Sequence, residues 1–347
     1  MGGPKGQEFG RSGTRRWQRF VVAALRVLSG RLQRMPRSTA MLWGRRLGEF
    51  AHFTTRTLVR RTQRYAHRNL CLTEFPHENA STAERDGFIR RVYIQFAKSG
   101  VDFLRGPALN RAELDRIVRA DGWQYAEEAR KAGKGTIFIT AHLGNWEMLG
   151  RWLAAHGIDL TVVAREPEEP AFAEFIHELR LNAGFKVAYR GDSARELLRL
   201  LKANRAIGLL PDQNSGDVFV PFFGVPAGTA VGPAALALHT GAALIPSYCV
   251  RLPDDTYRLL LLPPIDTRST GNREADQLRI TTEVNRVLET VIRDYPDQWL
   301  WLHNRWKSAF EEGNRTRAWP NGRDEAAVRR WNGDTAERHE FADRANR

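Results

Sequence analysis

A histidine and a glutamate stand close together at a point where core packing gives no reason for polar side chains. The stretch ITAHLGNWEMLG, residues 139–150, begins at the end of an apolar run that stops at Ala141. His142 follows at once, and Glu147 comes five residues later. A neutral imidazole with an ordinary pKa of about 6.5 accepts a proton near neutral pH. A carboxylate on its second ring nitrogen fixes the tautomer, so the pair has the chemistry of a general base and its orienting group.

The elements around this pair decide whether the two side chains can meet. Asn145 is a suitable N-cap for a helix over residues 146–156, and Gly157 lies just past its end. Glu147 then falls in the first turn, where the helix dipole favours a carboxylate. His142 lies in the preceding turn, at the carboxyl end of a strand, where open α/β sheets bind their ligands. The alternative is a capped turn in which the histidine has only a structural role.

No serine or cysteine stands beside His142 as a protein nucleophile. The attacking group would therefore be a hydroxyl of the substrate, and His142 would take its proton. A zinc site is not predicted, because no third ligand follows at a useful spacing.

Beyond residue 123, apolar segments of strand and helix type alternate. Strands are predicted at 136–141, 158–164, 206–210, 218–222, 243–250 and 256–262. Helices are predicted near 146–156, 171–183, 193–203, 231–241 and 274–294. Such alternation is typical of a largely parallel sheet covered by helices on both faces. The last two strands flank a short turn, LPDDT, and read as an antiparallel edge hairpin, so the predicted fold is a mixed α/β sheet.

The segment from 218 to 250 contains no charged residue and is long enough to span a membrane. Prolines and glycines divide it into short pieces, which would leave backbone groups unpaired in lipid. We therefore interpret it as a buried unit of strand, loop, helix and strand.

Positive charge is concentrated at the N-terminus. The formal net charge is +13, yet residues 1–70 alone hold 16 Lys or Arg and 2 Asp or Glu, a net of +14. From Trp17, apolar residues recur at helical spacing, and two further basic helices are predicted at 39–53 and 55–69. Basic amphipathic helices suit an anionic membrane surface. A solvated basic face is the alternative, and no nucleic-acid-binding motif accompanies the charge.

These patterns predict three regions. Residues 1–107 form a basic helical region for membrane association, with Ser81 and Glu84 as the capping box of its last helix. Residues 108–310 form the α/β domain, and residues 311–347 form a polar, disordered tail. Cys71 and Cys249 are too few and too distant for a disulfide framework, which indicates a reducing compartment. No cleavable signal peptide is evident.

Several blocks, in order, resemble the bacterial lipid A biosynthesis acyltransferases, the late lauroyl and myristoyl transferase family. The first block is HLGNWE, which contains His142 and Glu147. The others are VVAREPEEP (162–170), the long block at 209–251 that begins LLPDQNSGDVFVPFFG, LLLPPID (260–266) and PDQWLWLHNRWK (296–307). The resemblance spans roughly residues 17–310 and includes the basic N-terminal helices.

The resemblance implies a role for each matching residue. His142 would deprotonate the acceptor hydroxyl, Glu147 would orient it, and Arg165 would stabilise the oxyanion of the thioester carbonyl. Substrate-binding residues would be Asn145, Asp212, Gln213, Gly228 and Thr229, the last two in a turn near a head-group phosphate or sugar. The alternatives are an exposed strand-end charge for Arg165, a turn cap for Asp212 and a plain turn glycine at 228. His303 is expected to pack rather than to react.

The implied protein is a peripheral or monotopic acyltransferase at the cytoplasmic face of the cell inner membrane. It would move a fatty acyl chain from a thioester donor, preferably acyl carrier protein, to a hydroxyl of a lipid A precursor, and needs no metal or organic cofactor. One alternative is an acyl-CoA-dependent transferase acting on a lysophospholipid or another glycolipid. Another is a non-catalytic membrane-binding protein on the same fold.

Overall fold

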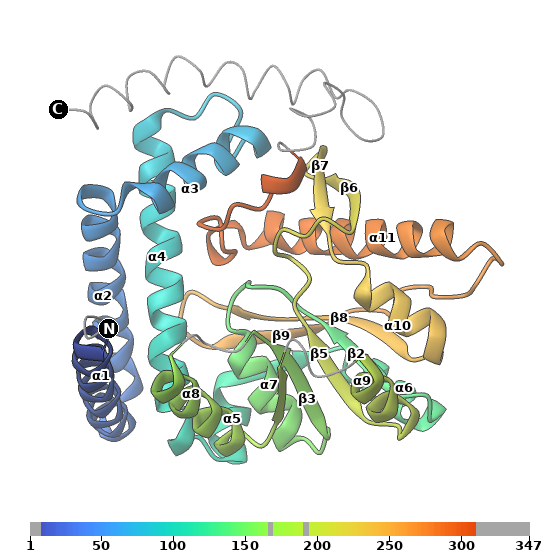
Figure 1. Cartoon of the computed structure of the whole chain (residues 1–347), viewed down its shortest axis with the longest axis horizontal. Helices are drawn as coiled ribbons and strands as arrows, with labels where there is room; N and C mark the ends of the chain where they lie inside the picture. Colours follow the sequence, from blue (N-terminus) through green and yellow to red (C-terminus); the bar gives the residue numbers. More distant parts are fainter. Residues whose placement is uncertain (1–7, 166–168, 190–193, 310–347) are drawn as a thin grey trace, which may run out of the picture.

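The computed structural model describes residues 8–165, 169–189 and 194–309 (Figure 1). The polar tail predicted at 311–347 lies outside these residues. Three layers make up the larger part of the molecule, a central sheet with helices on each side, and long N-terminal helices stand beside them.

The central sheet has seven strands in the order β1-β9-β8-β2-β5-β3-β4. Its strands are β1 Val118–Asp121, β2 Thr136–Ile139, β3 Leu160–Ala164, β4 Lys186–Tyr189, β5 Ala206–Leu209, β8 Ala243–Arg251 and β9 Tyr257–Leu261. The five strands from β8 to β4 run parallel, β9 is antiparallel to β8, and β1 is parallel to β9. The predicted fold class, a mixed and largely parallel α/β sheet, is confirmed.

Helices cover both faces of this sheet, as predicted. On one face lie α6 Trp123–Ala132, α7 Trp146–Ala155 and α8 Pro170–Asn182, with the short α5 Arg111–Ile117 beside them. On the other lie α9 Ala194–Lys202, α10 Gly232–Thr240 and α11 Arg273–Asp294. Alternate residues of β2 explain this arrangement, because Phe138 packs into the core of the first face whereas Ile137 and Ile139 pack into that of the second.

Two details of the predicted sheet are wrong. The strand predicted at 218–222 exists as β6 Val218–Phe222, but it pairs with β7 Val225–Thr229 as a hairpin outside the main sheet. Phe223 and Gly224 both have positive φ, which gives a two-residue turn that returns the chain immediately. The hairpin of β8 and β9 is present, but β9 is not an edge, because β1 pairs with its outer side.

The uncharged segment 218–250 forms β6, β7, α10 and β8, which is the predicted buried unit with one strand more. Within the part of the chain that the structure describes, none of the helices combines the length and apolar character that a membrane span requires.

The described part of the N-terminal region consists of four helices: α1 Glu8–Arg34, α2 Arg37–Thr57, α3 Arg60–Thr73 and α4 Thr82–Arg105. The predicted capping box is present, since Ser81 Oγ accepts from the Glu84 amide and the Glu84 carboxylate accepts from the Ser81 amide. Helix α4 stands between α2 and the sheet domain (Figure 1). Its residues Phe88, Ile89 and Val92 share a core cluster with tryptophans of the C-terminal segment. The N-terminal region is therefore joined to the domain by a continuous core.

Glycines bring α2 and α4 close together. A Cβ added to Gly44 would lie 3.0 Å from the Lys98 Cα, and one added to Gly48 would lie 2.5 Å from the Ile94 Cα. Only residues without a side chain permit this approach of two helix backbones.

We expect Gly48→Ala to lower the free energy of unfolding, because its Cβ meets backbone that cannot rotate away. Overpacking of this kind costs about 1–3 kcal/mol. Gly100→Ala, in α4, is the matched control, because an added Cβ meets nothing within 4 Å. That variant should gain about 0.5–1 kcal/mol from helix propensity. Urea unfolding measures both, and equal stability of the two variants would contradict the close packing.

Candidate active site

The turn between β2 and α7 is held by backbone hydrogen bonds on several sides. The Gly144 amide donates to the Gln298 carbonyl at 2.9 Å, and the Asn145 amide donates to the Cys249 carbonyl at 2.8 Å. Gly144 has φ of +63°, and a Cβ there would lie 2.1 Å from the Cys249 carbonyl oxygen. The Leu300 amide donates to the His142 carbonyl at 3.0 Å. Position 144 therefore requires glycine, and the backbone of His142 is fixed.

Asp212, rather than Glu147, supplies the carboxylate on the imidazole. The Nδ1 of His142 lies 2.9 Å from Asp212 Oδ1, and the His142 amide donates to Oδ2 at 2.9 Å. The indole N–H of Trp299 also donates to Oδ2, at 3.1 Å. Asp212 is only 3% exposed, so these donors replace water around its charge. With Nδ1–H bound to the carboxylate, Nε2 presents the lone pair that a general base needs.

The surroundings displace both pKa values. Burial lowers the pKa of His142, but the charge of Asp212, their hydrogen bond and the charge of Glu147 outweigh it, so the pKa lies above its ordinary value. Burial likewise raises the pKa of Asp212, but the charge and hydrogen bonds of His142, with that of Trp299, hold it below its usual range. Each member of the pair therefore favours the charged form of the other.

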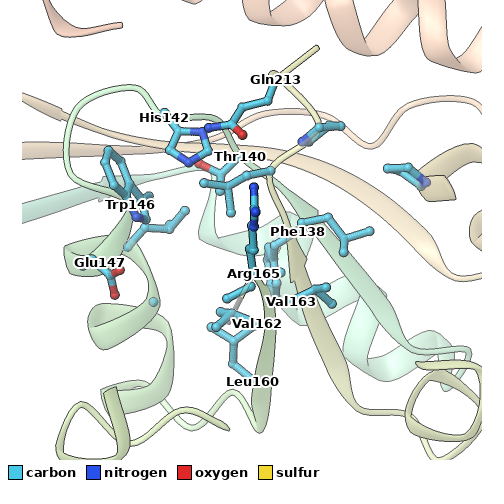
Figure 2. A pocket seen from close by; sticks show the side chains of 18 of the residues that line it. Phe138, Thr140, His142, Trp146, Glu147, Leu160, Val162, Val163, Arg165 and Gln213 are labelled. Atoms are coloured by element: carbon cyan, nitrogen blue, oxygen red, sulfur yellow. The ribbon is translucent and has the colours of Figure 1, made fainter. Parts of the chain in front are cut away.

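Glu147 does not bind the imidazole, so the contact predicted between Glu147 and His142 is wrong. Its carboxylate is held by Arg180 of α8, with Nη2 at 2.6 Å from Oε1 and Nε at 3.2 Å from both oxygens. Figure 2 shows this carboxylate pointing away from the His142 ring. The helix start directs Glu147 toward α8, whereas Asp212 approaches the ring from the turn that follows the neighbouring strand β5.

A cavity of about 640 Å³ opens beside His142 and extends along the sheet under α7. Most of its lining is apolar, with Phe138, Leu149, Leu153, Leu160, Val162 and Phe185 among the contacts. Figure 2 shows His142 and Gln213 at one end and Leu160 at the other. Gly208 of β5 pairs in register with Phe138 and Val162, and its missing side chain leaves the sheet face open there. The cavity has the shape and polarity for an extended hydrocarbon chain.

Two other predicted residues line this cavity. Arg165, directly after β3, is exposed, and its side chain points into the cavity (Figure 2). Gln213 is also exposed and lies next to His142 in the same view. The structure therefore brings together His142, Glu147, Arg165, Asp212 and Gln213.

Three predicted substrate-binding residues lie elsewhere. Asn145 is 2% exposed, and its side chain caps α7 through the Met148 amide while donating to the Tyr257 hydroxyl. Gly228 and Thr229 lie in strand β7 rather than in a turn. Both are buried, and both accept hydrogen bonds from the buried guanidinium of Arg305. None of the three lines the cavity, because these backbone and core contacts occupy them.

Residues missed in the sequence also line the cavity. Phe172, Ile176 and Arg180 of α8 form one wall, and their spacing of four residues would have indicated a shared helix face.

His303, expected to pack, accepts from the Asn214 amide through Nε2 at 3.0 Å, and burial lowers its pKa. Within residues 8–165, 169–189 and 194–309, no group of three or more His, Cys, Asp or Glu is arranged to hold a metal ion.

Comparison with known proteins gives a family match over most of the chain. A family model described as bacterial lipid A biosynthesis acyltransferase matches residues 7–308. The chain is 31% identical over 225 residues to the phosphatidylinositol mannoside acyltransferase of Mycobacterium tuberculosis (strain CDC 1551 / Oshkosh), covering 62% of this chain and 68% of the relative. The protein of that name in Mycolicibacterium smegmatis is 30% identical, covering 67% and 76%. The lipid A biosynthesis palmitoleoyltransferase of Escherichia coli (strain K12) is 25% identical, covering 79% and 87%.

We expect Asp212→Asn to lower the pKa of His142, because the carboxylate charge is what raises it against burial. Glu147→Gln should lower this pKa by less, because its charge contributes less than that of Asp212. An NMR titration of the His142 ring measures both changes. An unchanged pKa in Asp212→Asn, with the fold intact, would disprove the coupling.

Proposed function

The chain belongs to the bacterial lipid A biosynthesis acyltransferase family, and from this premise we propose that His142 and Asp212 catalyse its acyl transfer. The substrates in this proposal are a fatty acyl thioester and a hydroxyl of a lipid A precursor or a related glycolipid. The observation that carries it is the hydrogen-bonded pair of His142 and Asp212 at the end of an apolar cavity.

In the first step, Nε2 of His142 takes the proton of the acceptor hydroxyl while its oxygen attacks the thioester carbonyl. Asp212 stabilises the imidazolium that forms, and it is placed to do so at 2.9 Å from Nδ1. Because the hydroxyl belongs to the acceptor, no covalent intermediate with the protein is needed.

The second step is the collapse of a tetrahedral intermediate whose carbonyl oxygen carries a negative charge. Arg165, which points into the cavity beside His142, is the proposed stabilising cation (Figure 2). The carbon–sulfur bond then breaks, and the imidazolium returns its proton to the departing thiolate. The thioester has become an oxygen ester, and His142 is again neutral.

The cavity under α7 is the proposed site of the acyl chain. Each methylene of the acyl chain that these apolar walls remove from water stabilises the bound state by about 0.8 kcal/mol. Glu147 is proposed to act through Arg180, since it holds this guanidinium against the cavity wall. In this role Glu147 positions Arg180, a cation for the substrate head, and does not position His142.

The donor and the acceptor are proposed at the level of chemical class. Acyl carrier protein is the favoured donor and acyl-CoA the alternative. A lipid A precursor is one candidate acceptor. A phosphatidylinositol mannoside is the second, because two relatives at 30–31% identity are named phosphatidylinositol mannoside acyltransferase. Both acceptors are glycolipids with hydroxyl groups, which a base at the end of an apolar cavity can deprotonate.

The N-terminal helices are the proposed membrane-binding surface. Large apolar side chains of α2 are exposed, including Leu42, Trp43, Leu47, Phe50 and Phe53 at 53–64%. Trp17 and Phe20 of α1 are each 65% exposed. Both helices lie at one side of the molecule (Figure 1), and this part of the chain carries its excess of positive charge. We propose peripheral binding to an anionic bilayer, with the cytoplasmic face of the inner membrane as its location.

His142→Ala should reduce acyl transfer by a factor of about 10²–10⁴ while the fold stays intact, because it removes the base. Asp212→Asn should also slow transfer. It should move the rising limb of the pH–rate profile to lower pH, because the base must be neutral and loses the charge that raises its pKa. Glu147→Gln should leave most of that limb in place. Near-normal turnover by folded His142→Ala would refute the assignment.

The substrates are tested by offering purified protein both donors with a panel of lipid A precursors, mannosylated phosphoinositides and lysophospholipids. Mass spectrometry should show a mass gain of one acyl chain on a glycolipid, absent with His142→Ala. Acylation of lysophospholipids alone would overturn the proposed acceptor class.

Binding to vesicles with anionic lipid should weaken as salt brings the Debye length below about 10 Å, because exposed charges are then screened. The exposed apolar side chains of α1 and α2 should leave a fraction bound at high salt. Cosedimentation measures both parts. Equal binding to neutral and anionic vesicles at low salt would disprove the electrostatic contribution.

A further inference from the structure

We propose that Arg37 and Asp102 couple bilayer binding by α2 to the position of the catalytic turn 142–145, so that docking raises turnover. The proposal rests on the proposed function, because one of its two readouts is the rate of acyl transfer. The other readout, hydrogen exchange of the turn, does not depend on catalysis. It makes Asp102 a positioning residue, remote from the reacting atoms.

Asp102 of α4 is the centre of a buried polar cluster. It is 1% exposed, and its Oδ2 accepts three hydrogen bonds. The donors are the Tyr257 hydroxyl at 2.6 Å, Arg37 Nη2 at 3.0 Å and Arg251 Nη1 at 3.1 Å. Arg37 and Arg251 also face the Tyr257 ring, at 5.6 and 4.6 Å from its centroid. In so dry a place, charge interactions are strong, and the loss of one partner disturbs the others.

The cluster reaches the catalytic turn by two routes. In the first, Tyr257 accepts from Asn145 Nδ2 at 2.9 Å, and Asn145 caps the first turn of α7. In the second, Ser99 of α4 accepts from Arg251 Nη2 at 3.4 Å and donates to the Gly144 carbonyl at 3.1 Å. Asn145 and Gly144 are the last residues of the turn that begins with His142. Helix α4 therefore holds this turn through side chains one helical turn apart.

Arg37 is the member of the cluster that belongs to the proposed membrane-binding surface. It is the first residue of α2, the helix whose exposed side chains include Trp43, Phe50 and Phe53. Its own side chain is 19% exposed, whereas those of Asp102 and Arg251 are 1% and 2% exposed. A bilayer that fixes the orientation of α2 also fixes Arg37 on Asp102. Tyr257, Asn145 and His142 then keep their relative positions.

The test follows acyl transfer from a water-soluble short-chain thioester to a hydroxyl of a water-soluble glycoside, which replaces the lipid acceptor, with and without vesicles of phosphatidylcholine and phosphatidylglycerol. The glycoside ester and the released thiol are measured. Wild-type turnover should rise several-fold when the protein is vesicle-bound. Arg37→Gln should bind the vesicles but lose the rise. Arg46→Gln is the matched control, because it removes the same charge from the same helix at a side chain that is 80% exposed. Arg37→Lys, which keeps the charge beside Asp102, should recover part of the rise.

Hydrogen exchange provides the second readout. Amides of residues 142–147 should exchange more slowly on vesicles in wild type and Arg46→Gln, but not in Arg37→Gln. Equal stimulation and equal protection in Arg37→Gln and Arg46→Gln would overturn the coupling, as would a wild type that binds vesicles with neither effect. If wild type transfers an acyl chain neither to the glycoside nor to any lipid acceptor of the panel, the proposed function fails, and the exchange measurement alone decides the coupling.

Discussion

A carboxylate shut away from water keeps its charge only where hydrogen-bond donors replace the water, and Asp212 has such donors. They come from the His142 ring and amide and from the Trp299 indole. Three distant segments must therefore meet: the end of β2, the end of β5 and the aromatic C-terminal segment. The parallel pairing of β2 with β5 supplies the first two, and the Trp299 core supplies the third.

The burial of Asp212 also divides the site into a rigid part and an exposed part. His142 and Asp212 lie just beyond strand ends and are held by buried hydrogen bonds, so the imidazole is fixed before any substrate arrives. Arg165 and Gln213 are exposed at the cavity, where a substrate head can move them. A fixed imidazole with exposed side chains around it suits a family whose relatives are named for different glycolipids, phosphatidylinositol mannoside and lipid A.

Local patterns in the sequence predicted most of the fold, because apolar runs and helix caps act over a few residues. The strands β1 and β4 were not predicted, because both are short edge strands with charged residues, such as Arg119 and Lys186. The partner of His142 was missed for another reason. Glu147 is near in sequence, whereas Asp212 is 70 residues away and becomes a neighbour only through the strand order. Sequence spacing singled out His142 but not the carboxylate that binds its ring.

The segment that supports the site is the last described part of the chain. Gln298, Trp299 and Leu300 hydrogen-bond to the catalytic turn or to Asp212, and they lie some 90 to 160 residues beyond it in the chain. Synthesis proceeds from the N-terminus, so the basic helices leave the ribosome long before this support exists. A nascent chain therefore exposes the proposed membrane-binding helices first, and His142 acquires a fixed geometry only when the tryptophans emerge. In the order of the sequence, the proposed membrane-binding helices precede the residues that fix the geometry of the site.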